Sequence, residues 1–501
     1  MKLNKNSFLK YLPIAIIWAL GLFLRCYRQS SLLPFYYDQG RDAKMAMDIV
    51  ALKNFPAIGP TTGINGLYLG PFWFYLITPG YFFGQGNPVI ASYFIAFLES
   101  LTIPLIFYLI KTYWRTNTAY LASFIWAFSH YLIRSSRWFS NPSPLPFFVL
   151  LLMIFLIKVF KDKKYYLLPW IALILGVSLQ LEAASAIFFF PIILIFFIIN
   201  FSQIKKIKLL IWLKSVLAFL VLLLPQLAFE IKNNFLITHN FIGFLTGKVN
   251  SDNGKSWAIP TLNFLVTRLN AYYQNFFSKL DTNVTQFSLL FLIIFLVGIL
   301  FLVWKYRNNI LIKLQLLWLF IPLLLLLFFV GNYGNLYDYY LTGFFPAFII
   351  LFTVIISLPK KLFFYLLLII PTVIYFFKGT YVPLKNYLSA GIDGSETVVY
   401  GNEIQAVDFA CKKNSETPGN YDVYVPPVIA HAYEYLFQWR QSKGLCPQFI
   451  QERNSNLYII YEVDPPHPER LQNWFDKYKN DRLIHEEFFG GVRVKQIQRK
   501  P

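Results

Sequence analysis

The sequence predicts a polytopic α-helical membrane protein that ends in a small α/β domain. Three observations lead to this prediction. Of the 501 residues, 56% are hydrophobic and only 14% are charged, whereas soluble domains are about one quarter charged. Apolar runs long enough to cross a bilayer recur through the first 380 residues. Beyond them, short polar-flanked segments of alternating helical and strand character take over.

Eleven of the apolar runs are expected to cross the membrane. They are 9–27, 88–110, 118–135, 143–160, 165–182, 184–201, 208–228, 286–304, 313–330, 340–357 and 361–377. The first run is followed by LFLRCYR, which lacks a small-residue cleavage site, so we interpret it as a retained span and not as a signal peptide. A domain boundary is expected near residue 380, between a membrane domain (1–380) and an α/β domain (381–501).

The charge pattern predicts the orientation. Residues 380–501 hold 14 basic and 15 acidic side chains of the chain's 45 and 25, so 31 basic and 10 acidic side chains remain in residues 1–379. The basic excess lies in the short connections, at every second one, and this is the pattern of cytoplasmic loops. We therefore expect a cytoplasmic N-terminus, an extracytoplasmic C-terminal domain and no nucleic-acid partner.

One further apolar segment, GLYLGPFWFYLITPGYFFG (66–84), is not counted as a span. Counting it would move the basic connections that follow to the outside, and Pro71 and Pro79 disfavour a continuous helix. We expect a re-entrant or interfacial helix, covered by other spans because broken backbone cannot face lipid. It belongs to a long first outer loop, residues 28–87. Eight of the ten acids in residues 1–379 then fall on the outer side, so the chemistry is expected there.

Three sequence stretches, taken with this layout, resemble those of a known protein family. They are YYDQGRDA in the first outer loop, GPTTGINGLYLGPFWFYL after it, and SRWFSNPS at 136–143. The layout resembles the polyprenyl-phosphate-sugar-dependent glycosyltransferases of the C-type fold, in particular the protein O-mannosyltransferase and aminoarabinose transferase group. Where that group usually has an Asp-Glu pair, this chain has Asp38-Gln39. The resemblance implies a lipid-linked sugar donor and an extracytoplasmic acceptor that is a protein, a lipid or a glycan.

Such an enzyme needs a carboxylate near the membrane plane to take the acceptor's proton, and one base suffices for inversion without a covalent intermediate. Asp38 is the expected base. The alternative is that Asp38 only caps a helix starting at Gln39, and the two roles are compatible. Asp42, one turn further on, is expected to pair with Arg41 or Lys44 and is the second candidate for the base.

The donor phosphate needs cations on the outer side. Arg137 is the first candidate because a guanidinium matches phosphate oxygens, with Asn141-Pro142 holding its loop; snorkelling from a span end is the alternative. The other expected donor-site residues are Arg41, Asn141, Lys248 and Lys255, and Arg134 and Arg268 are further candidate cations on the outer side. Four residues are expected to line the cavity: Glu182, Tyr337, Asp338 and Tyr339. For the three residues of the 337–339 segment, a place in the interfacial aromatic belt is the alternative.

No cofactor is firmly predicted. The five histidines show no metal-ligand spacing, although a divalent metal held by Asp38 and the phosphate remains possible. No phosphate-cradling glycine motif is present, which disfavours a nucleotide-sugar donor. The competing function is a transporter or lipid-carrier flippase, which would be expected to show an internal repeat or several helices broken deep in the membrane.

The last part of the chain is expected to contain three helices and three strands. Cys411 and Cys446 both lie in it, and an oxidising compartment would allow them to form a disulfide. The alternative is two unrelated thiols.

Overall fold

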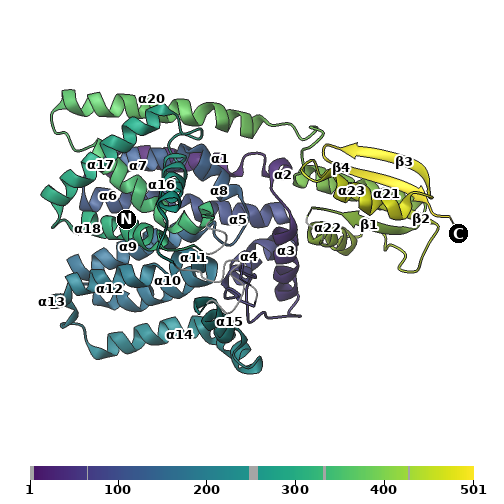
Figure 1. Cartoon of the computed structure of the whole chain (residues 1–501), viewed down its shortest axis with the longest axis horizontal. Helices are drawn as coiled ribbons and strands as arrows, with labels where there is room; N and C mark the ends of the chain where they lie inside the picture. Colours follow the sequence, from purple (N-terminus) through teal and green to yellow (C-terminus); the bar gives the residue numbers. More distant parts are fainter. Residues whose placement is uncertain (1–4, 65, 247–257, 331–334, 427–428, 501) are drawn as a thin grey trace.

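The computed structural model describes residues 5–64, 66–246, 258–330, 335–426 and 429–500. A bundle of helices makes up the larger part, and a small sheet domain with its own helices lies beside one end of it (Figure 1). A long helix, α20 (Leu362–Ser389), runs along the bundle toward the sheet domain. It passes residue 380, where we expected the domain boundary, and the first helix of the sheet domain starts at Tyr400.

Each predicted span corresponds to one helix or to two consecutive ones. The single helices besides α20 are α1 (Lys5–Cys26), α9 (Leu145–Lys161), α14 (Leu209–Lys232), α17 (Gln286–Tyr306) and α18 (Ile310–Leu326). The divided ones are α5–α6 (Pro88–Ser100, Thr102–Tyr113), α7–α8 (Thr116–Phe128, His130–Arg137), η1–α10 (Tyr165–Leu167, Leu168–Leu181), α11–α12 (Ala183–Ala186, Phe189–Ile199) and η3–α19 (Asp338–Phe344, Phe345–Ile356). Among the described residues, six helices are long and apolar enough to cross a membrane, and three shorter apolar helices accompany them. The chain is thus a multi-pass membrane protein.

The remaining helices are short or lie outside these runs: α2 (Gln29–Leu32), α13 (Phe201–Ile204), α15 (Leu236–Leu245) and α16 (Leu262–Phe277). Helix α19 lies at the centre of the bundle, and all of its twelve residues are buried. A helix that is apolar on every side is expected in such a position.

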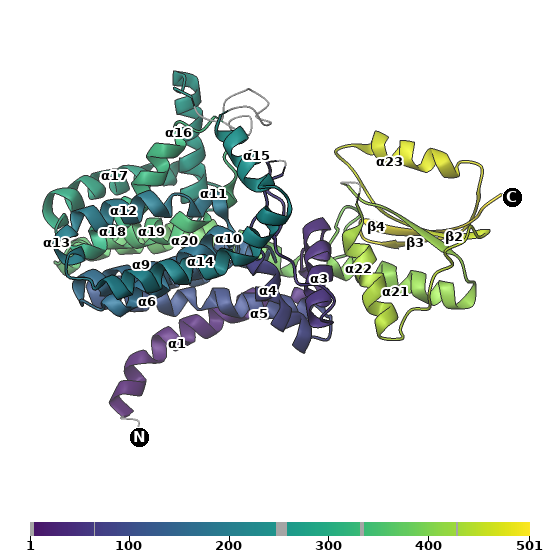
Figure 2. The same ribbon diagram turned by 90° about the horizontal axis from the view of Figure 1, so that it is seen from below.

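The first outer loop contains two helices, α3 (Tyr37–Val50) and α4 (Phe72–Phe83). With twelve residues α4 is only about 18 Å long, too short to cross a bilayer alone. Trp73 and Tyr81 are fully buried, whereas Phe82 and Phe83 at the end of α4 are exposed, so the protein covers one face of α4 and the predicted covering of segment 66–84 is only partial. Figure 2 shows α3 standing between the bundle and the sheet domain.

The C-terminal domain has a four-stranded sheet of order β1-β2-β4-β3. Strands β1 (Asn420–Tyr424) and β2 (Asn456–Glu462) are parallel, while β3 (Arg482–Phe489) and β4 (Val492–Gln498) complete the sheet in antiparallel pairs. Helices α21 (Tyr400–Glu416) and α22 (His431–Ser442) cover one face, and α23 (Pro468–Phe475) with the turn η4 (Asp476–Tyr478) lies on the other (Figure 2).

The sequence predicted every one of these elements except β3. Its sequence, RLIHEEFF, is rich in charge, and its residues are mostly exposed because it is an edge strand. The signal that could have revealed it is the two-residue Gly490-Gly491 connection to β4, since such glycine pairs are typical of tight hairpins. Gly490 has a positive φ of 61°, which a glycine adopts without strain.

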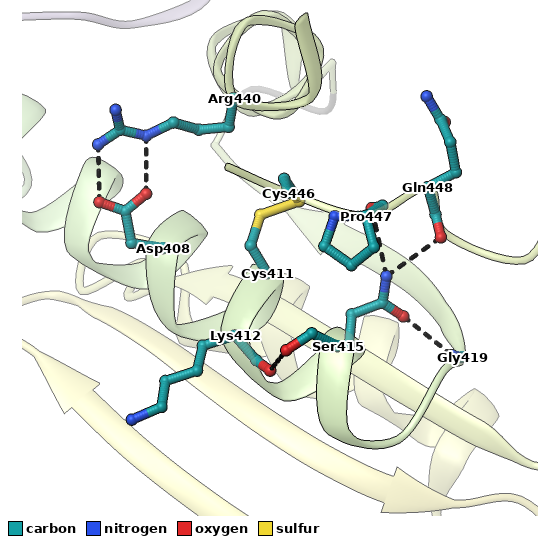
Figure 3. Close-up of a disulfide and its surroundings, with 10 residues drawn as sticks. Asp408, Cys411, Lys412, Ser415, Gly419, Arg440, Cys446, Pro447 and Gln448 are labelled. Carbon is teal, nitrogen blue, oxygen red and sulfur yellow. Dashed lines mark hydrogen bonds and ion pairs between the residues drawn. A yellow bond between two sulfur atoms is a disulfide. The ribbon is translucent and has the colours of Figure 1, made fainter. Parts of the chain in front are cut away.

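A disulfide joins Cys411 of α21 to Cys446, which follows α22 (Figure 3). The two Cα atoms are 4.8 Å apart, so of the two alternatives that the sequence left open, the structure contains the disulfide. Two further contacts hold the same elements together. Arg440 and Asp408 form a two-point ion pair with both distances at 2.7 Å, and the Asn414 amide donates to the carbonyls of Pro447 and Gln448.

Candidate functional site

Helix α3 begins two residues before the position that the sequence suggested. Its first residue is Tyr37 and its N-cap is Tyr36, so Asp38 lies inside the first turn and is not the cap. Gln39 does the capping work. Its Oε1 accepts from the backbone N–H of Tyr36 at 3.0 Å, and its Nε2 donates to the carbonyl of Phe139 at 3.0 Å. The capping interpretation of Asp38 is therefore wrong, and its carboxylate is left for other contacts.

Arg41 lies between the two carboxylates of α3. It contacts Asp38 Oδ1 through Nη1 at 2.9 Å and Asp42 Oδ1 through Nε and Nη2 at 2.9 and 2.7 Å. The Asp38 side chain is 53% exposed, whereas that of Asp42 is 2% exposed. One carboxylate is thus available to a ligand and the other is not. The predicted pairing of Asp42 with Arg41 is confirmed.

Asp42 has a closed set of hydrogen bonds. Its second oxygen, Oδ2, accepts from the indole N–H of Trp73 on α4 at 2.7 Å. Burial raises the pKa of Asp42 to about 6, and the adjacent Arg41 opposes this rise. Since both oxygens are taken by fixed donors, Asp42 connects α3 to α4 and orients Arg41. This geometry disfavours Asp42 as the base, because both of its oxygens already accept hydrogen bonds from the protein.

The C-terminal domain packs directly on α3. A Cβ added to Gly40 would lie 2.3 Å from the backbone nitrogen of Ala432 at the start of α22, so only glycine allows this approach. Beside it, the rings of Tyr37 and His431 have their centroids 4.8 Å apart. The site therefore lies at the junction of the membrane part and the sheet domain.

The 138–141 segment connects α3 to the rest of the bundle, and Arg137 before it holds the end of α1. Its guanidinium is fully buried and donates to the carbonyls of Leu24 and Tyr27 at 3.1 and 2.6 Å, and to the Tyr387 hydroxyl at 3.2 Å. The last carbonyls of a helix need such donors, and here Arg137 supplies them to the end of α1. One nitrogen of the guanidinium, Nη2, has no hydrogen-bond partner among the described residues, so phosphate binding by Arg137 stays a prediction beside this structural role.

Asn141 also has a structural contact. Its amide donates to the carbonyl of Leu181 at 2.6 Å, and this places the 138–141 segment beside Glu182. Glu182 is 6% exposed, and its carboxylate caps α11 by accepting from the Ala184 N–H at 3.1 Å. Glu182 is thus a buried helix cap at the turn between two helices.

The tyrosines around Asp338 lie close to the same segment. The rings of Tyr337 and Tyr339 are stacked at 5.4 Å, and Tyr339 lies 6.4 Å from Trp138 between ring centroids. Asp338 accepts a short hydrogen bond from the Tyr131 hydroxyl. The structure thus brings the 337–339 segment next to the 138–141 segment. The 138–141 segment in turn contacts α3 through the carbonyl of Phe139.

Lys279 is a cation that the sequence analysis did not select. It is fully buried, and its Nζ lies 3.2 Å from the ring centroid of Tyr131 and 4.0 Å from that of Phe345. Among the described residues it forms no ion pair with an acid; its amine donates only to the Ser278 hydroxyl at 3.1 Å. Burial lowers the pKa of Lys279 well below its usual range. A lone lysine after a helix carries no sequence signal that separates it from a surface residue.

Two predicted donor-site residues, Lys248 and Lys255, lie outside the described residues. Of the other cations considered, Arg134 is exposed, whereas Arg268 is buried and donates to the Phe329 carbonyl at 2.8 Å. In the described part of the chain, no three His, Cys, Asp or Glu side chains gather at a point that could hold a metal ion. At Asp38 and Asp42, the place between the carboxylates belongs to Arg41. These residues do not fit a divalent metal.

A helical bundle with carboxylates on a juxtamembrane helix and a small outer domain docked on that helix is the layout of membrane glycosyltransferases of the C-type fold. The family model "Dolichyl-phosphate-mannose-protein mannosyltransferase" matches residues 70–229. No curated protein sequence matches the chain significantly.

Solved structures share the fold over nearly the whole chain. ArnT from Cupriavidus metallidurans, bound to undecaprenyl phosphate, is 9% identical, with 98% of each chain covered and a TM-score of 0.59. The oligosaccharyltransferase of Archaeoglobus fulgidus, in complex with Zn and sulfate, is 12% identical over 90% of this chain and 68% of that one, with a TM-score of 0.52. The family match over residues 70–229 and the shared fold agree with the resemblance stated from the sequence: the chain has the fold of the membrane glycosyltransferases of the C-type.

Proposed function

We propose that this enzyme transfers a sugar from a polyprenyl-phosphate carrier to an acceptor on the extracytoplasmic face, with inversion and with Asp38 as the base. The observation that carries this proposal is the exposed carboxylate of Asp38, set on α3 between the bundle and the docked outer domain. The similarity to ArnT, whose structure contains undecaprenyl phosphate, supports the donor class.

The proposed reaction needs one base and one leaving group. Asp38 takes the proton of the acceptor hydroxyl as the acceptor oxygen forms its bond to the anomeric carbon. The bond from that carbon to the phosphate oxygen breaks on the opposite side, and the carrier leaves as polyprenyl phosphate. Arg41 holds the Asp38 carboxylate in place through its contact of 2.9 Å, and Asp42 in turn holds Arg41.

Lys279 is our candidate for a cation that meets the donor phosphate. A buried charge without a counter-ion is costly, and the described residues offer Lys279 only aromatic rings and one hydroxyl. A bound phosphate would supply the missing anion and would keep the amine protonated. Two cations predicted from the sequence remain candidates beside it. The Arg41 side chain is 21% exposed, and Nη2 of Arg137 has no hydrogen-bond partner among the described residues.

The acceptor is expected to bind in the C-terminal domain. A cavity of about 870 Å³ is lined by polar residues that include Asp422, Glu434 and Lys477. Glu434 contacts His431 at 3.1 Å, and the His431 ring lies against Tyr37, the residue before Asp38. The cavity therefore reaches the part of α22 that touches α3, where an acceptor group must arrive.

The orientation follows the charge pattern, with a cytoplasmic N-terminus and an extracytoplasmic C-terminal domain. If α4 does not cross the membrane, accessibility tags inserted at residues 62 and 86 will both report from the outside. A tag at 86 that reports from the cytoplasm would contradict the proposed topology.

The test of the function is transfer by the purified chain. It is incubated with a panel of polyprenyl-phosphate sugars carrying a radiolabel in the sugar, with mixed membrane proteins and lipids as acceptors. We expect at least one donor to be consumed by the wild-type protein and not by Asp38→Asn. Equal consumption by both proteins would refute the assignment of the base, and consumption of no donor by either would refute the donor class.

A further inference from the structure

A second cavity, of about 510 Å³, lies at the opposite end of the bundle from the C-terminal domain. It is formed where α7 begins and where the chain passes from α19 to α20, and its lining includes Arg115, Asn117, Thr118, Ser357 and Lys360. Helix α20 has 28 residues and is thus about 42 Å long. Its other end leads to the C-terminal domain, so this cavity is far from the candidate active site.

Two helices start at this cavity without a cap. Helix α7 starts at Thr116 and α20 at Leu362, and both residues line the cavity. Neither N-cap, Arg115 nor Lys361, accepts a hydrogen bond through its side chain. Within the described residues, the first-turn N–H groups of both helices have no acceptor. The starts of helices carry partial positive charge and are suited to bind anions.

An independent observation points to a missing ligand. The Thr118 side chain is 0% exposed and the Ser357 side chain is 1% exposed, and neither hydroxyl has a hydrogen-bond partner among the described residues. Both residues line the cavity. Buried hydroxyls nearly always have a partner, so two unpaired hydroxyls at one cavity indicate a bound group that accepts hydrogen bonds.

The charges around the cavity have a single sign. Arg115 is anchored by Nη1, which donates to the Ser357 carbonyl at 2.8 Å and to the Leu358 carbonyl at 3.4 Å. The rest of its guanidinium makes no hydrogen bond to the described residues. Lys360 is exposed, and no Asp or Glu belongs to the lining. Basic connections alone are explained by membrane topology, but the uncapped helices and the unpaired hydroxyls are not.

We propose that this cavity binds the phosphate group of an anionic membrane lipid, in the leaflet opposite to the active site. A lipid source is favoured by the surroundings of the cavity. Leu362 and Phe363, at the start of α20, are 69% and 70% exposed. They begin a helix that is long and apolar enough to cross the membrane, so they lie where acyl chains meet head groups. A phosphate there can reach the helix starts while its acyl chains lie against these side chains.

The test measures lipid binding by the purified full-length chain in detergent. Phosphatidylglycerol, phosphatidylcholine and inorganic phosphate are added separately; bound lipid is counted by native mass spectrometry, and the thermal midpoint is recorded. We expect phosphatidylglycerol to remain bound and to raise the midpoint, with little effect of the other two.

Two variants test the site itself. Thr118→Val removes one hydroxyl at nearly constant volume and should weaken phosphatidylglycerol binding about tenfold without lowering the midpoint of the lipid-free protein. Lys360→Gln should weaken binding about fivefold, as expected for one basic residue at a membrane surface. The matched control is Lys164→Gln, which removes an exposed lysine from the connection between α9 and α10. This variant should change neither phosphatidylglycerol binding nor the thermal midpoint.

Unchanged binding in Lys360→Gln and in a folded Thr118→Val would overturn the proposal. If Thr118→Val does not fold, Lys360→Gln measured against Lys164→Gln decides alone. Protection by inorganic phosphate at the same concentrations as by phosphatidylglycerol would overturn the lipid assignment.

Discussion

Removing the disulfide of the C-terminal domain is the perturbation whose size can be worked out most directly. Replacing Cys411 and Cys446 by alanine opens a loop of 35 residues. In the loop-entropy model, a closed loop of this length stabilises the folded state by about 4 kcal/mol at 25 °C. For a domain of about 100 residues, this loss corresponds to a fall of roughly 15–30 °C in the unfolding temperature. The ion pair and the amide contacts beside the bridge remain in the variant, so we expect a folded but much less stable domain.

The assay is proteolysis of the full-length chain in detergent, with short trypsin pulses at rising temperature and detection of the C-terminal domain. Wild-type protein treated with a reductant should behave like the double variant, and the double variant should not respond to the reductant. The matched control is Cys26→Ala, because Cys26 is the free cysteine at the end of α1. Equal unfolding temperatures for wild type and double variant, with no effect of reductant on either, would show that the bridge does not form.

The same pair of cysteines reports on topology. Structural disulfides persist in extracytoplasmic compartments and are rare in the cytosol. In protein taken from cells under denaturing, non-reducing conditions, we expect a maleimide to label Cys26 alone. Labelling of all three cysteines would argue against an extracytoplasmic C-terminal domain.

Three other predictions concern α3. Asp38→Asn should lower sugar transfer by at least about 100-fold with donor binding retained, because the amide cannot take a proton; transfer rate and donor affinity are measured separately, and full activity would refute the role of base. Gly40→Ala should loosen the C-terminal domain, since the added Cβ would meet the backbone of α22 at 2.3 Å; protease cleavage between the domains should increase, while Gly63→Ala, whose Cβ meets nothing within 4 Å, should behave as wild type. Burial raises the pKa of Asp42 from 3.8 to about 6, so the folded state holds this proton more tightly than the unfolded state. Its contribution to stability is complete below about pH 4 and is lost toward pH 6, by at most about 1.4 kcal/mol per pH unit. Denaturant titrations should show this slope in wild type and not in Asp42→Asn; equal slopes would contradict it.

Much of the fold could be predicted because it depends on local pattern. The spans follow from runs of apolar residues. In segment 66–84, Pro71 marks the start of α4 as its sequence suggested, whereas Pro79 lies inside the helix and does not break it. In the C-terminal domain, periodicity predicted the buried elements correctly. It failed for β3, where the residues are mostly exposed and the apolar-polar alternation that marks a half-buried strand is absent.

The candidate site could be predicted only in part, because the roles of its residues depend on contacts between segments that are distant in the sequence. Asp38 and Asp42 are four positions apart on one helix, yet Asp38 is exposed and Asp42 is buried. The partner that encloses Asp42, Trp73, comes 31 residues later in the chain. Gln39 was passed over because its importance comes from the carbonyl of Phe139, 100 residues away. No local pattern carries either fact.

The case of Arg137 shows why a cation at the outer end of a helix is ambiguous. A phosphate and the last carbonyls of a helix both accept hydrogen bonds from N–H donors at the membrane surface, and a guanidinium can supply these donors to either. Arg137 meets the carbonyls of residues 110 and 113 positions earlier in the chain, a contact that its sequence neighbours do not announce. Lys279 is the reverse case, since it has no local mark but lies buried among rings with no acid in an ion pair with it in the described part of the chain. The protein uses Nε and Nη1 of Arg137, but its Nη2 has no hydrogen-bond partner among the described residues. A buried cation whose charge is unbalanced is a good candidate, and since Arg137 is as fully buried as Lys279, Lys279 joins Arg137 as a candidate and does not replace it.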